Sequence, residues 1–120
     1  MDANHQNRCS PYRCGVELTL ELIGGKWKGV ILWHLAAITL RFSQLQRRMA
    51  GITQKMLTQQ LRDLERDGLI IRTVYAEVPP RVEYALTQKG SSLKSLLSEM
   101  REWGEQYGRR ALENSQAGVD

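Results

Sequence analysis

Residues 42–66, FSQLQRRMAGITQKMLTQQLRDLER, decide the fold of this 120-residue chain. Apolar side chains recur at helical spacing on both sides of a glycine turn; these are Leu45, Met49, Leu57, Leu61 and Leu64. Ser43 is placed to cap the first helix and Thr53 to cap the second. Ala-Gly-Ile at 50–52 fits a tight turn between them. The stretch therefore predicts two short helices joined by a three-residue turn.

Further elements are expected on both sides of this pair. Helices are predicted over 16–23 and 27–37, a short extended piece over 38–41, a hairpin of strands over 69–75 and 82–87, and a final helix beginning at Thr87. The loop between the strands is stiffened by Pro79 and Pro80. The fold class is therefore mainly α with a small β-hairpin, a winged helix-turn-helix.

Composition excludes several classes of protein. Hydrophobic residues make up 42% and charged residues 25%, which is ordinary globular usage. No apolar run approaches the ~18 residues of a membrane-spanning helix, and residues 1–6 show no signal-peptide pattern. Two cysteines are too few for a disulfide scaffold. We therefore expect a cytoplasmic protein that does not bind membranes.

Catalysis and metal binding have little support in the sequence. Gly24-Gly25-Lys26 lacks the glycine spacing of a phosphate loop, and Trp27 stands where Ser or Thr would bind magnesium. Three candidate metal ligands lie near the N-terminus without a fourth: His5, Cys9 and Cys14. His34 falls in the apolar stripe of its helix and is expected in the core. We expect no enzyme activity, metal or cofactor.

The positive charge is concentrated in the middle of the chain. Residues 26–81 hold ten lysines and arginines against four acidic residues, a net charge of +6, whereas residues 1–25 and 82–120 carry −1 each. A basic segment between mildly acidic ends suggests a surface for a polyanion.

Four motifs resemble one family of bacterial transcriptional regulators. They are Ile-Gly-Gly-Lys-Trp at 23–27, Arg-Phe at 41–42, Gly-Ile-Thr-Gln-Lys-Met-Leu-Thr-Gln-Gln-Leu at 51–61 and Glu-Val-Pro-Pro-Arg-Val-Glu-Tyr at 77–84. The chain resembles the HxlR family over about residues 14–107. The resemblance implies a homodimeric winged-helix protein that binds double-stranded DNA near promoters. It also implies a winged-helix domain with N- and C-terminal dimerisation helices over 14–107. Residues 1–13 are polar and without periodicity, which predicts an arm that is mobile or held by a partner, and residues 108–120 are expected to form a helix end and tail.

Residues 53–66 would then form the helix that reads DNA. At 1.5 Å per residue this helix is about 21 Å long, enough to lie in a major groove. Its candidate base-reading side chains are Gln54, Lys55, Thr58 and Gln59. Arg47, Arg48 and Arg62 suit phosphates, and Arg81 at the hairpin tip suits a minor groove or phosphate. The plainer alternatives are a solvated helix face and an Arg81 that pairs with Glu77 or Glu83.

The final helix carries an apolar stripe that either packs on its own domain or pairs with a second subunit. The stripe consists of Leu93, Leu96, Leu97, Met100, Trp103 and Tyr107. The resemblance favours a dimer interface, because a twofold dimer reads two half-sites about 34–36 Å apart.

Cys14 occupies the place, just before the first helix, where family members that sense oxidants or electrophiles carry a cysteine. The helix N-terminus and the neighbouring Arg13 would lower the pKa of its thiol. Cys9 is a second candidate sensing residue. The family pattern commonly has Pro after this cysteine, whereas this chain has Gly15.

The sequence thus predicts a homodimeric repressor on a palindromic operator, responsive to oxidants or electrophiles through Cys14. Two alternatives stay open. One is a regulator that responds to a small ligand between the wing domain and the dimer helices. The other is a winged-helix module whose basic face docks an acidic protein.

Overall fold

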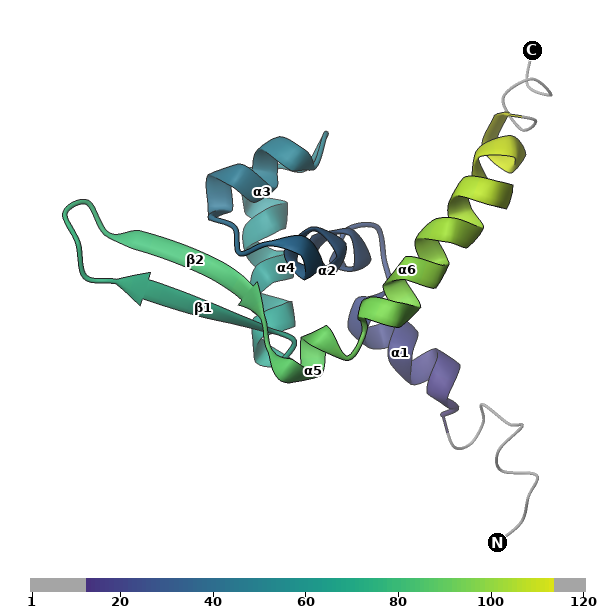
Figure 1. Cartoon of the computed structure of the whole chain (residues 1–120), viewed down its shortest axis with the longest axis horizontal. Coiled ribbons are helices and arrows are strands. Elements are labelled where there is room, and N and C mark those ends of the chain that lie inside the picture. The colour runs from purple at the N-terminus through teal and green to yellow at the C-terminus, as the bar shows by residue number, and fades with distance from the viewer. Residues whose placement is uncertain (1–12, 114–120) are drawn as a thin grey trace, which may run out of the picture.

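The structure, a computed structural model, describes residues 13–113 (Figure 1). Its elements follow in the order α1 (Gly15–Ile23), α2 (Lys28–Ala37), α3 (Phe42–Arg48), α4 (Gln54–Arg66), β1 (Ile70–Tyr75), β2 (Arg81–Leu86), α5 (Gln88–Ser91) and α6 (Lys94–Trp103). A π-helical turn, Gly104–Gly108, follows α6, and the chain stays helical through residue 113. The predicted winged helix-turn-helix is confirmed. The domain boundaries at residues 13 and 108 stay predictions.

The helix pair α3 and α4 forms as predicted, with one correction. Thr53 caps α4, its hydroxyl oxygen accepting a hydrogen bond of 3.1 Å from the amide of Met56. Gly51 makes the turn with a φ of +91°, which favours glycine. The predicted cap at Ser43 is wrong. The N-cap is Arg41, two residues earlier, and the side chain of Gln44 accepts the Arg41 amide at 2.8 Å.

The hairpin is a two-stranded antiparallel sheet whose register runs from Ile70 opposite Leu86 to Tyr75 opposite Arg81. The extended piece expected over 38–41 contributes one bridge to its edge. There Leu40 donates to the carbonyl of Tyr84 at 3.1 Å and accepts from its amide at 2.8 Å. These bonds fix the base of the hairpin beside α3.

The core is built mainly from leucine and isoleucine side chains. It comprises Ile23, Ile31, Leu32, Leu35, Leu40, Leu45, Met49, Ile52, Leu57, Leu61, Leu64, Leu69, Ile70, Tyr84 and Leu97. In α2 the buried residues are Ile31, Leu32 and Leu35. His34, expected in the core, is only half-buried, because the buried arc of this helix is centred on the neighbouring positions.

The last helical region is divided where a single helix was expected. Thr87 does cap a helix, accepting from the Gly90 amide at 3.0 Å, but this helix, α5, ends at Ser91. Gly90 packs so closely on the backbone just before β1 that a Cβ there would lie 2.1 Å from the carbonyl oxygen of Leu69. Residues 92 and 93 then turn the chain into α6.

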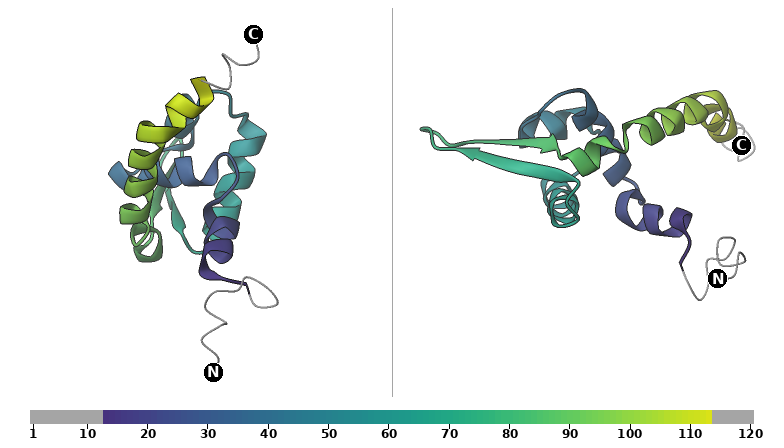
Figure 2. Two further views of the ribbon diagram at one scale, coloured as in Figure 1. Left: turned by 90° about the vertical axis from the view of Figure 1, so that its right-hand side faces the viewer. Right: turned by 60° about the horizontal axis from the view of Figure 1, so that its bottom comes forward.

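The elements that could meet a partner lie at the two ends of the molecule. The hairpin projects to one side, and α1 and α6 lie on the opposite side (Figure 1). Figure 2 shows α6 extending away from the helix-turn-helix body, with α1 splayed from it.

Candidate nucleic-acid interface

The residues of α4 that were predicted to contact DNA lie on its outward face. Leu57, Leu61 and Leu64 are buried, so the opposite side of the helix faces solvent. Around one shallow depression on that side lie Thr53, Gln54, Lys55, Thr58, Gln59 and Arg62. The five predicted residues of this helix therefore share one accessible surface.

A groove of about 480 Å³ separates α4 from the base of the hairpin. Its lining includes Gln54, Thr58 and Arg62 from α4 and Arg72 from β1. Sequence reasoning did not single out Arg72, which brings a further positive charge beside Arg62. The sequence indicated only that Arg72 lies in the strand that follows α4. That it faces the same groove as Arg62 depends on how the hairpin packs in the tertiary fold.

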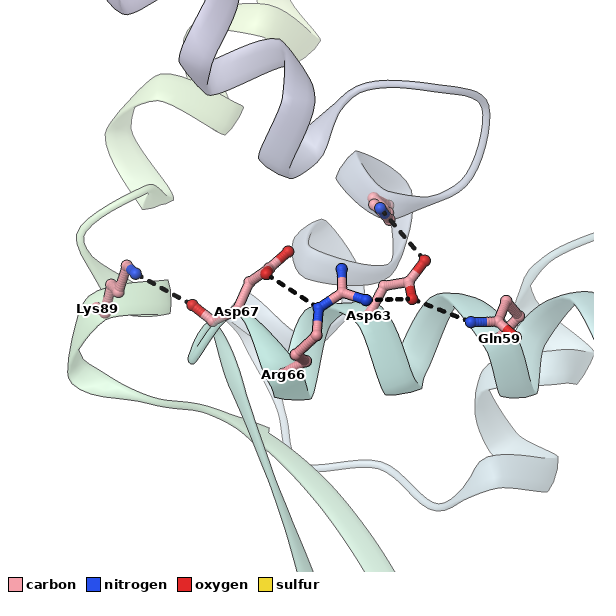
Figure 3. A network of polar contacts seen from close by, with 6 residues as sticks. Gln59, Asp63, Arg66, Asp67 and Lys89 are labelled. Atoms are coloured by element: carbon pink, nitrogen blue, oxygen red, sulfur yellow. Dashed lines mark hydrogen bonds and ion pairs between the residues drawn. The ribbon is translucent and has the colours of Figure 1, made fainter.

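A polar network runs along the side of α4 that faces α2 (Figure 3). The amide nitrogen of Gln59 donates to Oδ1 of Asp63 at 3.0 Å, and Lys28 Nζ lies 3.5 Å from Oδ2. Arg66 lies 3.4 Å from both Asp63 and Asp67. The hydrogen bond from Gln59 holds the pKa of Asp63 below its ordinary value; Lys28 and Arg66 act in the same direction, against desolvation. Sequence reasoning also missed Asp63.

Arg81 is engaged within the hairpin. Its guanidinium lies 4.1 Å from the ring centroid of Tyr75 and pairs with Glu77 at 3.1 Å and Glu83 at 3.4 Å. The structure thus shows the pairing that was the plainer alternative for this residue. A phosphate would have to compete with two carboxylates for it.

The two arginines at the end of α3 are both exposed. Arg48 lies near His34; burial, and then the charge of Arg48, lower the pKa of this imidazole. Of the two, Arg48 brings its charge to the side of α3 that faces α2.

The apolar stripe of the final helix divides into two parts. Leu97 is buried and Leu93 packs against the core, so these two side chains stabilise their own domain. The other four remain exposed: Leu96 (39%), Met100 (47%), Trp103 (65%) and Tyr107 (52%). On α1, Val16 and Leu20 are also exposed. A mainly apolar groove of about 410 Å³ lies between α1, α2 and α6.

Cys14 directly precedes α1 and is partly exposed. Arg13, expected to favour its thiolate, pairs with Glu17 at 3.4 Å and with Glu21. Its charge is therefore shared with two carboxylates, and its effect on the thiol of Cys14 stays a prediction. Cys9 lies outside the described residues.

The sequence signature of the HxlR-like helix-turn-helix family matches residues 22–112. The chain belongs to this family. Among its HxlR-like relatives, the Bacillus subtilis helix-turn-helix-type transcriptional regulator YdeP is 53% identical over 97 residues, covering 81% of this chain and 76% of YdeP.

Solved structures of related regulators share the fold. The crystal structure of YtcD, a helix-turn-helix-type regulator of Bacillus subtilis, is 56% identical with a TM-score of 0.74, and the match covers 79% of this chain and 97% of YtcD. The redox regulator HypR is 50% identical in its oxidised form, with a TM-score of 0.75 and coverage of 78% and 96%. Its reduced form gives 49% identity, a TM-score of 0.77 and coverage of 82% and 97%.

This HxlR-like chain is therefore a transcriptional regulator with a DNA-binding helix-turn-helix domain. Its family and relatives are regulators rather than enzymes. Within residues 13–113, no helix is long and apolar enough to cross a membrane.

Proposed function

We propose that this chain acts as a homodimeric repressor that reads a palindromic operator through α4. The gathering of Gln54, Lys55, Thr58, Gln59 and Arg62 on one accessible face carries the proposal. Amide side chains can pair with adenine, lysine with guanine and the threonine methyl with thymine. Arg62, Arg47 and Arg48 would hold phosphates and so fix the register.

The exposed apolar residues of α1 and α6 support the dimer. One helix reads only a few base pairs, whereas a twofold dimer reads two half-sites about 34–36 Å apart. Exposed side chains such as Trp103 and Met100 would be covered by the same region of a second subunit. Leu93 and Leu97 would hold α6 on its own domain.

Regulation by oxidants or electrophiles is proposed to act through Cys14. HypR is a redox regulator with about half of its residues identical to this chain, and Cys14 lies where α1 begins. The oxidant diamide would take two electrons and two protons from a pair of thiols, Cys14 and Cys9 or the Cys14 of each subunit, as the S–S bond forms. The new bond would shift α1 and change the half-site spacing.

The test is fluorescence anisotropy with the DNA upstream of the chain's own gene and a random duplex as control. Tight, sequence-preferring binding is expected under reduction, with loss of binding after diamide. A dimer that neutralises about eight phosphates should give a slope of log K against log salt near −7. Equal weak binding to both duplexes would refute the proposal that an operator lies in this upstream DNA. A Cys14→Ala variant that keeps its full response to diamide would refute the switch.

One observation favours the alternative of a small-ligand effector. A cavity of about 410 Å³ lies between α2, α3 and α6, and Trp33, His34, Arg48 and Lys94 are among its lining residues. Arg48 and Lys94 beside an indole suit an organic anion. Reversible, saturable release of DNA by an aromatic carboxylate in reducing buffer would support this version.

A further inference from the structure

The side-chain amide of Gln59 has a fixed orientation in the structure. Its nitrogen, Nε2, donates to Oδ1 of Asp63 at 3.0 Å. An ionised carboxylate can only accept hydrogen bonds. The opposite orientation would place two acceptors, Oε1 of Gln59 and Oδ1 of Asp63, against each other. The amide nitrogen is therefore turned towards Asp63, and the amide oxygen is left for another partner.

Asp63 is itself held from two sides. Lys28 on α2 lies 3.5 Å from Oδ2, and Arg66 on the next turn of α4 lies 3.4 Å from Oδ1 (Figure 3). Only 18% of the Asp63 side chain is exposed, and 16% of that of Lys28. A carboxylate anchored to a neighbouring helix is a firmer support for Gln59 than a free surface acid. The hydrogen bond from Gln59 holds the pKa of Asp63 below its ordinary, already acidic value, so this side chain is an acceptor at neutral pH.

We propose that Asp63 is a positioning residue that sets which bases Gln59 accepts in the major groove. The proposal rests on the proposed function, in which Gln59 reads bases. With one hydrogen of Nε2 engaged by Asp63, Gln59 offers the DNA its unengaged acceptor, Oε1, and only the second hydrogen of Nε2 as a donor.

The major-groove edges of the four bases then divide into two groups. Adenine N6 and cytosine N4 donate hydrogen bonds, whereas guanine and thymine present acceptors at O6 and O4. An unrestrained glutamine can use both its donor and its acceptor, as it does when it binds adenine in a bidentate manner. The restrained Gln59 should therefore favour adenine or cytosine, which donate to Oε1, over guanine or thymine, whose acceptors would need the remaining hydrogen of the tethered Nε2.

The test measures dissociation constants for operator duplexes carrying each of the four bases at every half-site position. Wild type is compared with Gln59→Ala, Asp63→Ala and Asp67→Ala. Asp67 is the matched control, because it is an acid at the same end of α4 that contacts Arg66 and not Gln59. Removing the negative charge of either acid should strengthen binding to all sequences alike. The role of Asp63 is therefore judged only from the ratios of dissociation constants between bases.

In wild type, one position should favour adenine and cytosine over guanine and thymine by about tenfold, the equivalent of ~1.4 kcal/mol. Asp63→Ala should reduce this ratio to about twofold, since the released amide can present its nitrogen to guanine or thymine. Asp67→Ala should leave the ratio as in wild type. In the Gln59→Ala background, Asp63→Ala should have no further effect on the ratio.

The possible failures are distinguishable. If Gln59→Ala leaves every base ratio unchanged, base reading by Gln59, and with it this part of the proposed function, is refuted. If Gln59→Ala abolishes the preference but Asp63→Ala keeps it, the role of Asp63 alone is overturned. Should Asp63→Ala fail to fold, Asp63→Asn keeps the shape and permits both amide orientations. A tenfold ratio retained in Asp63→Asn would equally overturn the proposal.

Discussion

Replacing Trp103 by alanine removes a large exposed apolar side chain from the end of α6. Its ring lies tilted against that of Tyr107, at a centroid distance of 5.2 Å, and 65% of the residue is exposed. Alanine is the best helix former, so the substitution leaves the helix intact. Its effect should therefore fall on the dimer rather than on the fold of the single chain.

The expected size of this effect follows from the exposed area. A buried aromatic side chain covers about 150–250 Å², so the exposed part of Trp103 amounts to about 150 Å². If a partner covers half of that, the loss is about 2 kcal/mol per side chain at ~25 cal/mol per Å². Twofold symmetry doubles it to about 4 kcal/mol, roughly a thousandfold in the dimer dissociation constant.

Sedimentation equilibrium over a wide range of protein concentration measures this constant directly. Val78→Ala is the control, because Val78 is equally apolar and fully exposed, but lies at the hairpin tip on the opposite side of the molecule. We expect wild-type dimerisation in this control. A Trp103→Ala dimer constant within about threefold of wild type would show that α6 does not use this surface.

Three further outcomes are expected. Gly90→Ala should lower the free energy of unfolding in urea by more than ~2 kcal/mol, because its Cβ would meet the Leu69 carbonyl oxygen. Gly15→Ala is the control, since a Cβ there has no neighbour within 4 Å and should cause no such loss. Equal losses in the two variants would contradict this prediction. Thr53→Ala should cost about 1 kcal/mol in the same assay through its lost helix cap, and Thr53→Ser should restore it. Burial and a neighbouring arginine lower the pKa of His34 in the folded chain. As the pH falls, His34 is therefore protonated in the unfolded chain before it is protonated in the folded chain. The free energy of unfolding should then fall as the pH drops below ~6.5. His34→Gln should lack that component between pH 7.5 and 5.5 in urea titrations; a wild-type pH dependence in the variant would refute the assignment.

The helix-turn-helix pair could be predicted because its signals are local. Gly51 supplies the turn, Thr53 the cap, and three leucines the buried stripe of α4. The outward face of that helix followed at once, because the side opposite a buried stripe faces solvent.

Other features depend on tertiary contacts and could not be predicted in this way. The division of the final helix is one of them: α5 ends at Ser91, and its Gly90 packs against Leu69, a residue distant in sequence from that helix. His34 was misplaced because α2 is apolar on several sides, so periodicity alone does not fix which side is buried. The restraint on Gln59 depends partly on Lys28, a residue of another helix.

The nine-residue helix α1 has a consequence for the amount of protein a cell must make. Ile23 is its only buried residue, and isolated helices shorter than about 12–15 residues are marginal in water. Covering Val16 and Leu20 by a second subunit would therefore stabilise α1 itself, so that helix formation and assembly are linked. The melting temperature should rise with protein concentration, and changes in expression level alone would alter the fraction of chains able to occupy DNA.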